Sequence, residues 1–528
     1  MVDWTNNSDA IKPWAKWIGF RDNSYYLLLL IPTILFLVSL YVPPTIVSDS
    51  AVGFLALRSM LEGGPFNSIT SPDPANIAYN VATFVTFWSP GQYLVPGLFI
   101  WLGTNYGLAL SLTTLIATLV GVLGWIEVAR SFHVSSYVLF VFAFGLTTFP
   151  YVTQRFLGFW GGELLLFATA PWSLYAMRWS ANKPAILCFT ISLLSAALLF
   201  FAKLTGLIVF ATNVVAISLL TIIIQRRLRS SIIAMWAASV IAALCFTIFW
   251  LARGPVAADG SAFSFSWLPI WFSVTGVAFS GIYGLALLLG HSWLQINSEL
   301  ASELLGPVAL LLMVWVWFQL RHTCYRNMAI LLFVIILVYA IILTGLWLHG
   351  ADIPFEDRHF RYAGILFFLL LLTAVDQRRV PLAKGLACSV VILLGVYGVR
   401  NYATFASVQM RAGDYDLING ISQDVVTPVV LEHMRAEVTQ HNFQHPIAVI
   451  PSASAAISLP RFRIIYFGWE RRLRAGIKWA GRAEKIFVIV PEEMGLNGEA
   501  EAILRSFTDY NFDNWNQLNL DGMIIYCQ

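Results

Sequence analysis

Long apolar stretches alternate with short polar segments along residues 1–400 of the chain. A helix needs about 20 residues, at a rise of about 1.5 Å each, to cross the hydrocarbon core of a bilayer. Eleven stretches reach or approach that length. We therefore predict membrane-spanning helices over residues 25–42, 107–128, 135–150, 163–178, 184–202, 204–224, 232–251, 304–321, 328–349, 361–375 and 384–400.

Composition agrees with a polytopic membrane protein. Of the 528 residues, 58% are hydrophobic and 12% are charged, whereas soluble domains use about a quarter of their residues on charge. The lipid bilayer is therefore an expected partner. The net charge of +3 does not indicate a nucleic-acid partner, and we expect none.

The positions of the cations predict the orientation of the helices, because Lys and Arg concentrate in short cytoplasmic loops. Two further apolar segments, 93–103 and 268–290, would place later basic clusters outside if either crossed singly, so we predict that both are re-entrant or lie at the surface. The N-terminus is then cytoplasmic and the chain from residue 401 lies outside. The basic clusters are Lys12, Lys16 and Arg21; Arg130 with His133; Arg178 with Lys183; Arg226, Arg227 and Arg229; Arg321 with Arg326; and Arg378, Arg379 and Lys384.

The tail, residues 401–528, is more polar and reads as a separate domain. Short apolar runs alternate in it with helical patterns, which is typical of an α/β fold. We predict strands at 447–451, 463–467, 486–490 and 522–526, and helices at 425–442, 453–459, 470–476 and 499–510. The fold class is thus an α-helical polytopic membrane protein, with about 11 transmembrane helices over residues 1–400, and a small C-terminal extracytoplasmic α/β domain.

The predicted outer loops carry the short motifs. The first begins with a helix that Ser48 or Asp49 would cap, and that Gly63-Gly64 would end. With these parts the chain resembles the GT-C superfamily of membrane glycosyltransferases, which includes protein O-mannosyltransferases and lipid A aminoarabinose transferases. The motifs that carry the resemblance are Asp49, Gly63-Gly64, Ser89-Pro90-Gly91, Leu102-Gly103, Gln154-Arg155, Gly161-Gly162-Glu163, Ala202-Lys203-Leu204-Thr205-Gly206 and Glu356-Asp357-Arg358-His359-Phe360-Arg361-Tyr362.

The resemblance implies a GT-C-like site made from these loops. Its catalytic carboxylates would be Asp49 and Glu163. Many relatives have a second acid where this chain has Ser50, and Glu163 would supply that carboxylate here. The donor phosphate would meet Arg358, Arg361, Lys203, Arg155, His359 and Tyr362, and the aromatic rings of Trp88 and Trp160 would line the sugar or acceptor site.

Glycosyl transfer from a lipid-linked sugar suits these residue types. An acceptor hydroxyl needs a general base within hydrogen-bond reach, for which Asp49 is the first choice. The phosphate leaving group gains negative charge as the bond breaks, and Arg side chains offer it planar, bidentate donors.

We therefore expect an inverting glycosyltransferase in the plasma (inner) membrane, which moves a sugar from a polyprenyl-phosphate donor to a glycan, lipid or protein acceptor on the outer face. No cofactor is indicated with certainty, and the pattern neither requires nor excludes a divalent metal. A lipid-linked glycan transporter or a polysaccharide polymerase stays open as the alternative. Such a protein would carry polar residues along a pathway through the membrane.

Each of these residues also has a structural interpretation. Asp49 would serve as a helix cap, Glu163 would favour the positive end of a helix dipole, and the arginines and Lys203 would reach toward the membrane surface from the ends of spans. His359 has no spacing typical of a metal ligand. Trp88 and Trp160 fit an aromatic belt at the interface.

Overall fold

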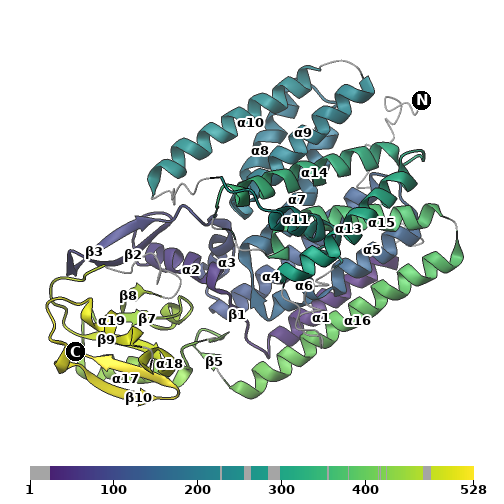
Figure 1. Cartoon of the computed structure of the whole chain (residues 1–528). Coiled ribbons are helices and arrows are strands. Elements are labelled where there is room, and N and C mark those ends of the chain that lie inside the picture. The colour runs from purple at the N-terminus through teal and green to yellow at the C-terminus, as the bar shows by residue number, and fades with distance from the viewer. Residues whose placement is uncertain are drawn as a thin grey trace.

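The computed structural model describes residues 24–225, 229–254, 263–282, 298–351, 353, 356–378, 380–413, 415–416, 418–423, 425–467, 477–496 and 498–528. A bundle of long helices forms most of the molecule, and a small α/β domain sits at one end of it (Figure 1). The predicted fold class is confirmed. The predicted cluster at Lys12, Lys16 and Arg21 lies outside the described residues.

A helix occupies each of the eleven predicted spans. By length and composition, eight described helices are long and apolar enough to cross a membrane, or nine when the bent pair Ser136–Thr148 and Pro150–Phe156 counts as one. The number of spans therefore stays a prediction. The helices of the bundle are η2 (Ser24–Leu29), α1 (Leu30–Ser39), α4 (Tyr106–Arg130), α5 (Ser136–Thr148), α6 (Pro150–Thr153), η3 (Gln154–Phe156), α7 (Gly161–Ser180), α8 (Ala185–Ala202), α9 (Gly206–Gln225), α10 (Ser230–Phe249), η4 (Leu251–Arg253), α13 (Ser298–Leu320), α14 (Arg326–Leu348), η5 (Asp357–Phe360), α15 (Arg361–Gln377) and α16 (Pro381–Ala412).

Burial separates the inner helices from the outer ones. In α15 72% of the apolar window is buried, against 17% in α10 and 17% in α16. Helix α15 therefore lies inside the bundle, and α10 and α16 present apolar faces outward. Helix α16 also runs through the predicted domain boundary at residue 400 and ends at Ala412, where Gly413 takes a left-handed conformation.

The two segments predicted not to cross singly form short helices, α3 (Gly91–Trp101) and α11 (Leu268–Phe279). An 11-residue helix is roughly 16 Å long at the rise of an α-helix, about half of the hydrocarbon thickness. The length of α3 agrees with the prediction. Part of the second segment, from residue 283, lies outside the described residues.

The first outer loop holds more structure than its sequence predicts. Strand β1 (Thr45–Ile46) leads into α2 (Ser48–Leu61), and an antiparallel hairpin of β2 (Ser68–Asp73) and β3 (Asn76–Phe84) follows. The prediction that Ser48 or Asp49 caps α2 was wrong. Val47, in an extended conformation, is the N-cap residue, and Asp49 lies in the first turn.

A small sheet links this loop to the rest of the chain. Its order is β4-β1-β6-β5, in which β4 (Gly158–Phe159) comes from the second outer loop, and β5 (Tyr415–Asp416) and β6 (Ile421–Ser422) come from the tail. Both neighbours of β1 run parallel to it.

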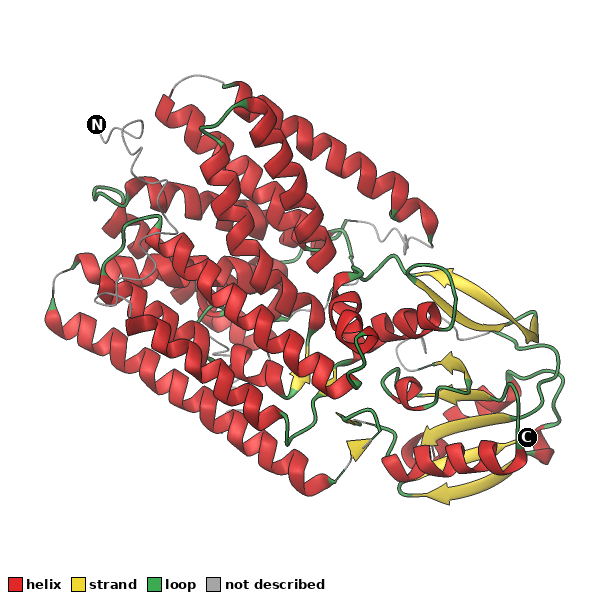
Figure 2. Ribbon diagram, turned by 180° about the vertical axis from the view of Figure 1, so that it is seen from behind, coloured by secondary structure: helices red, strands yellow, loops and turns green. Residues whose placement is uncertain are grey.

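The tail folds around a five-stranded sheet of order β10-β11-β9-β7-β8, in which β7, β8 and β9 are parallel (Figure 2). All four predicted strands are present, and β10 was missed. The predicted helix at 453–459 is a 3-10 turn, and that at 470–476 lies outside the described residues. The elements are α17 (Pro428–His441), β7 (Ile447–Ile450), η6 (Ala455–Ser458), β8 (Arg463–Tyr466), β9 (Ile486–Pro491), α18 (Glu492–Leu496), α19 (Glu499–Arg505), η8 (Phe512–Asn514), β10 (Asn516–Leu520) and β11 (Met523–Cys527).

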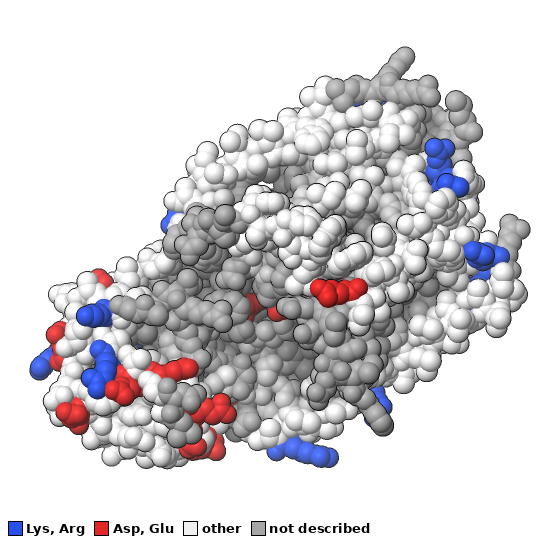
Figure 3. All heavy atoms as spheres, in the orientation of Figure 1, with Lys and Arg blue, Asp and Glu red and all other residues white. Residues whose placement is uncertain are grey.

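Charge is distributed as expected for a membrane protein. On the face in Figure 3 charged side chains gather on the tail and at the opposite ends of the helices, and the helical surface between them is largely uncharged. The tail and the first outer loop lie at the same end of the bundle (Figure 1). Whether this end faces outward stays a prediction from the basic clusters.

Candidate functional site

Two parallel strands bring Asp49 and Glu163 together. In the register Ile46 pairs with Phe159, and each strand leads directly into a helix, β1 into α2 and β4 into α7. Asp49 and Glu163 both lie in the first turn of their helix, where a negative charge is favoured by the helix dipole. The Gly161 amide donates a hydrogen bond to Ser50 Oγ at 3.0 Å, which joins the two helix starts.

Arg358 completes this arrangement from the loop before α15. Its Nη1 lies 2.8 Å from Asp49 Oδ2 and 3.5 Å from Glu163 Oε1, and its Nε pairs with Glu356. The guanidinium lies over the Trp160 ring, 4.8 Å from the centroid. The predicted proximity of Asp49, Glu163 and Arg358 is thus present in the structure.

Lys203 reaches Glu163 from the turn between α8 and α9. Its Nζ donates to Glu163 Oε1 at 2.6 Å. Gly162 makes this approach possible, because a Cβ at that position would already lie 3.2 Å from Lys203 Cγ. Glu163 therefore has two cations on one oxygen, and its side chain is 10% exposed, against 24% for Asp49.

Behind these pairs lies a narrow cavity lined by four cations, Arg155, Lys203, Arg358 and Arg361, and by one carboxylate, Glu163. Its volume of ≈ 20 Å³ has room for about one water. Such an excess of positive charge fits an anion.

Arg155 is the most notable of the four cations. It is 2% exposed, and none of its three guanidinium nitrogens has a hydrogen-bond partner among the described residues. Its guanidinium contacts two aromatic rings, Phe167 at 4.8 Å and Tyr151 at 5.7 Å from the centroids. Arg361 lies over the same Tyr151 ring at 4.8 Å, so both arginines contact Tyr151.

The other predicted site residues have different surroundings. His359 lines the cavity, and neither ring nitrogen has a hydrogen-bond partner in the described part of the chain. Tyr362 also lines the cavity, and its hydroxyl donates to Asn213 Oδ1 of α9 at 2.7 Å. Trp88 packs edge-on against Phe87 at 5.9 Å, whereas Trp160 lies directly beside the charged cluster.

Sequence reasoning missed two residues of this region, Tyr151 and Asn213, and gave no role to Glu356 of the last motif. Tyr151 precedes Arg155 by four positions, a spacing that places both on one face of a helix. Asn213 is a lone amide in an apolar span, and such residues usually have a partner inside the bundle. Glu356 pairs with Arg358; burial raises its pKa above the usual range of a glutamate, and the charge of Arg358 opposes that rise.

No metal site is evident where the structure describes the chain. Among those residues no group of three or more His, Cys, Asp and Glu side chains could hold a metal ion. The acids of the cluster are instead engaged by Arg358 and Lys203.

These features define a class by fold: a polytopic helical bundle of the kind seen in solved membrane proteins, with acidic and basic side chains of the loops gathered at one end of the bundle. Two solved structures of ArnT from Cupriavidus metallidurans, a GT-C lipid A aminoarabinose transferase, have this fold. The structure bound to undecaprenyl phosphate superposes with a TM-score of 0.55 at 12% identity, and 95% of this chain covers 97% of ArnT.

The apo structure of ArnT gives 0.53 at 11% identity, with the same coverage. The mycobacterial arabinofuranosyltransferase AftD superposes with a TM-score of 0.38 at 14% identity, and 81% of this chain covers 31% of AftD. No protein-family model and no curated protein matches the sequence.

Proposed function

We propose that the chain is an inverting glycosyltransferase, which moves a sugar from a polyprenyl-phosphate donor to an acceptor hydroxyl on the outer face of the plasma membrane. The observation that carries the proposal is Arg155. A buried charge without a hydrogen-bond partner is costly, and an anion in the adjoining cavity would remove that cost. ArnT, which has the same fold, binds undecaprenyl phosphate.

The donor phosphate would enter the cavity between Arg155 and Arg361, with His359 at its edge. Because the cavity has a volume of only ≈ 20 Å³, side chains must move to admit it. Arg358 is the group to move, since a phosphate competes with the carboxylates for its guanidinium. The prenyl chain would lie against the apolar faces of the helices.

Movement of Arg358 toward the phosphate would release Asp49. In the structure Arg358 Nη1 lies 2.8 Å from Asp49 Oδ2 and occupies the place of an acceptor hydroxyl. Once released, Asp49 accepts the proton of the acceptor hydroxyl while the hydroxyl oxygen attacks the anomeric carbon. The bond from that carbon to the phosphate oxygen breaks, and polyprenyl phosphate leaves with both bonding electrons. One displacement inverts the anomeric centre.

Glu163 has a different role in this proposal. Both Lys203 and Arg358 lie near its Oε1, so it is best suited to position these two cations. Asp49 is also the more exposed of the two acids, and an acceptor in solution reaches it more easily.

The test uses cells that lack the gene and are complemented with variants. The deletion should accumulate the polyprenyl-phosphate sugar, and the wild-type chain should restore transfer, with a product of opposite anomeric configuration by NMR. Asp49→Asn should leave the donor accumulated, because a general base typically contributes roughly 10²- to 10⁴-fold to the rate. The matched control Asp513→Asn removes an exposed acid of the tail and should restore transfer fully.

Two results would contradict the proposal. Normal transfer by an Asp49→Asn chain at wild-type abundance would exclude Asp49 as the base. A product that keeps the donor's anomeric configuration would exclude a single displacement.

A further inference from the structure

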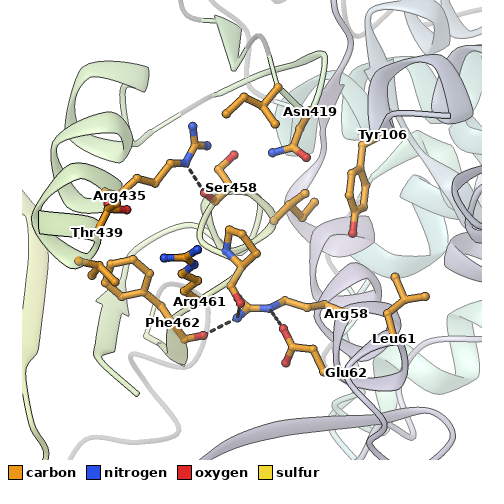
Figure 4. A pocket seen from close by; sticks show the side chains of 14 residues that line it. Arg58, Leu61, Glu62, Tyr106, Asn419, Arg435, Thr439, Ser458, Arg461 and Phe462 are labelled. Carbon is orange, nitrogen blue, oxygen red and sulfur yellow. Dashed lines mark hydrogen bonds and ion pairs between the residues drawn. The ribbon is translucent and has the colours of Figure 1, made fainter. Parts of the chain in front are cut away.

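A second cavity lies at the other end of the helix that carries Asp49. It has a volume of ≈ 450 Å³ and is formed by the last turn of α2, the start of α4 and the α17 and η6 regions of the tail (Figure 4). Ligand sites commonly occupy about 300–1,000 Å³. Arg58 follows Asp49 by nine positions on α2, which corresponds to roughly 14 Å along the axis. An oligosaccharide can bridge this distance.

Three arginines line this cavity, and two of them are engaged by the protein. Arg58 donates to the carbonyl oxygens of Ala456 at 2.9 Å and Pro460 at 3.2 Å, and pairs with Glu62. Arg435 donates to Asp416 at 2.8 Å. The contacts of Arg58 fix the tail against α2, whereas that of Arg435 with Asp416 lies within the tail.

Arg461 is the third arginine; it is exposed at the cavity, and no ion pair or hydrogen bond engages it within the described part of the chain. In Figure 4 it lies on one side of the cavity and Tyr106 lies on the other. Most of the lining between them is apolar, from Leu61, Val438 and Phe462 among others. A guanidinium and an aromatic ring that face one cavity can together recognise a sugar that carries an anionic group. The ring stacks on the face of the sugar, and the guanidinium donates two parallel hydrogen bonds to the anion.

We propose that this cavity binds a glycan unit that carries a carboxylate or a phosphate, with the anion on Arg461 and a sugar ring against Tyr106. We assign this unit to the acceptor, a step that rests on the proposed function. A wholly apolar ligand would leave Arg461 desolvated without a partner, which is unfavourable. A cationic ligand would be repelled by the arginines.

Direct binding to the purified full-length chain tests the site without reference to activity. Isothermal titration calorimetry would compare glucose 6-phosphate, glucose and inorganic phosphate. The sugar phosphate should bind saturably and more tightly than either control. Equal affinity for inorganic phosphate would overturn the sugar contact, and equal affinity for glucose would overturn the anion contact.

Variants locate the binding site. Arg461→Gln should weaken binding of glucose 6-phosphate about tenfold or more, through loss of charge-assisted hydrogen bonds, and Arg461→Lys should retain part of the affinity. Arg505→Gln, which removes an exposed arginine of the tail that pairs with Glu501, should bind as wild type. Unchanged affinity in a folded Arg461→Gln chain would overturn the proposal.

The two proposals fail separately in this design. Asp49→Asn should bind glucose 6-phosphate as wild type, because Asp49 is at the opposite end of α2. If Asp49→Asn retains transfer while Arg461→Gln loses binding, the proposed base is wrong and this site stands. If Asp49→Asn loses transfer while Arg461→Gln binds normally, this site is wrong and the proposed base stands.

Discussion

Arg155 is a buried positive charge, and its guanidinium has no hydrogen-bond partner among the described residues. The aromatic contacts with Phe167 and Tyr151 offset part of the desolvation cost, and a bound phosphate would offset more. In the absence of ligand, Arg155 should therefore destabilise the fold, as expected of a residue retained for binding.

We predict that Arg155→Met raises the thermal stability of the ligand-free chain. The gain should correspond to roughly 1–3 kcal/mol, the cost of an unsatisfied buried polar group. We expect undecaprenyl phosphate to raise the melting temperature of the wild-type chain, and the same substitution should remove that increase. Thermal unfolding in detergent, with and without this lipid, measures both effects.

Arg130→Met serves as the control for this experiment, since Arg130 pairs with Glu127 and does not line the cavity. It should keep the stabilisation by undecaprenyl phosphate. A chain with Arg155→Met that is still stabilised by the lipid would show that Arg155 does not contact the phosphate.

At the residue scale, the sequence predicts which charged residues belong to the site better than it predicts the contacts that each side chain makes. Asp49 and Arg358 were expected in one site because short motifs placed both at the same surface, and their ion pair is present at 2.8 Å. Tyr362 was assigned to the phosphate from its motif alone. Its hydrogen bond to Asn213 depends on the packing of α9 against α15, and no local pattern encodes that contact.

Among the elements, β1 and β4 determine where the two acids lie. Each strand has two residues and exists only through pairing with its neighbour, so neither is predictable from a local period of hydrophobic residues. The same holds for β6, which comes from the tail. The long helices, in contrast, follow directly from apolar stretches, and their ends differ from the predictions where a helix continues past its apolar stretch, as α16 does to Ala412.

Gly161 tests this arrangement, because it begins α7 beside β4. A Cβ there would lie 2.7 Å from Gln92 Cβ and 2.8 Å from the Phe159 ring, so α7 would have to shift, and with it Glu163. We predict that Gly161→Ala lowers kcat about 10²-fold, the typical cost of a misplacement of about 1 Å in an active site. Steady-state kinetics on purified protein measures it.

The matched control is Gly345→Ala in α14, where a Cβ meets nothing within 4 Å. This variant should have wild-type kcat and KM. A Gly161→Ala chain that turns over normally would show that the start of α7 tolerates movement, and that Glu163 does not need this position.

Asp416 in β5 should make the stability of the tail depend on pH. Burial alone would raise its pKa, but hydrogen bonds from Ser458 and Asn419 and the charge of Arg435 lower the pKa below the usual value. Because the pKa of Asp416 is lower in the folded chain than in the unfolded chain, its charged form stabilises the fold. This stabilisation is complete above the pKa of an unfolded aspartate, about 4. It is lost as the pH falls through the lower pKa of the folded chain.

We therefore expect the hydrogen-exchange protection of β7 and β9 to fall below about pH 4 in the wild-type chain. Asp416→Asn should lower protection at neutral pH and flatten this acid loss. Asp521→Asn, at an exposed turn of the tail, should behave as wild type. An acid loss of equal size in Asp416→Asn would assign the effect to other groups.

For the whole molecule, the orientation in the membrane is still a prediction from sequence alone. The structure places the tail and the acids at one end of the bundle (Figure 1), but side-chain contacts carry no information about which compartment that end faces. Only the basic loops do.

Labelling with a membrane-impermeant maleimide decides the orientation. In a chain with Cys527→Ser, a cysteine introduced at the exposed Asn514 should react in intact cells, because the basic clusters predict that the tail faces outward. The natural Cys324, exposed in a predicted cytoplasmic loop, should react only after permeabilisation. The reverse pattern would invert the topology and place the proposed reaction in the cytoplasm.

The sheet that joins β1 to β6 has a consequence for biosynthesis. The Ser422 amide donates to the Pro44 carbonyl at 3.1 Å, so the segment that leads into α2 is completed by residues made near the end of synthesis. A nascent chain contains Asp49 long before the ribosome has reached Ser422, and chains are made from the N-terminus onward. The site therefore acquires its full framework only after the tail has emerged and folded, and a chain truncated after α16 keeps Asp49 without the strand that supports it.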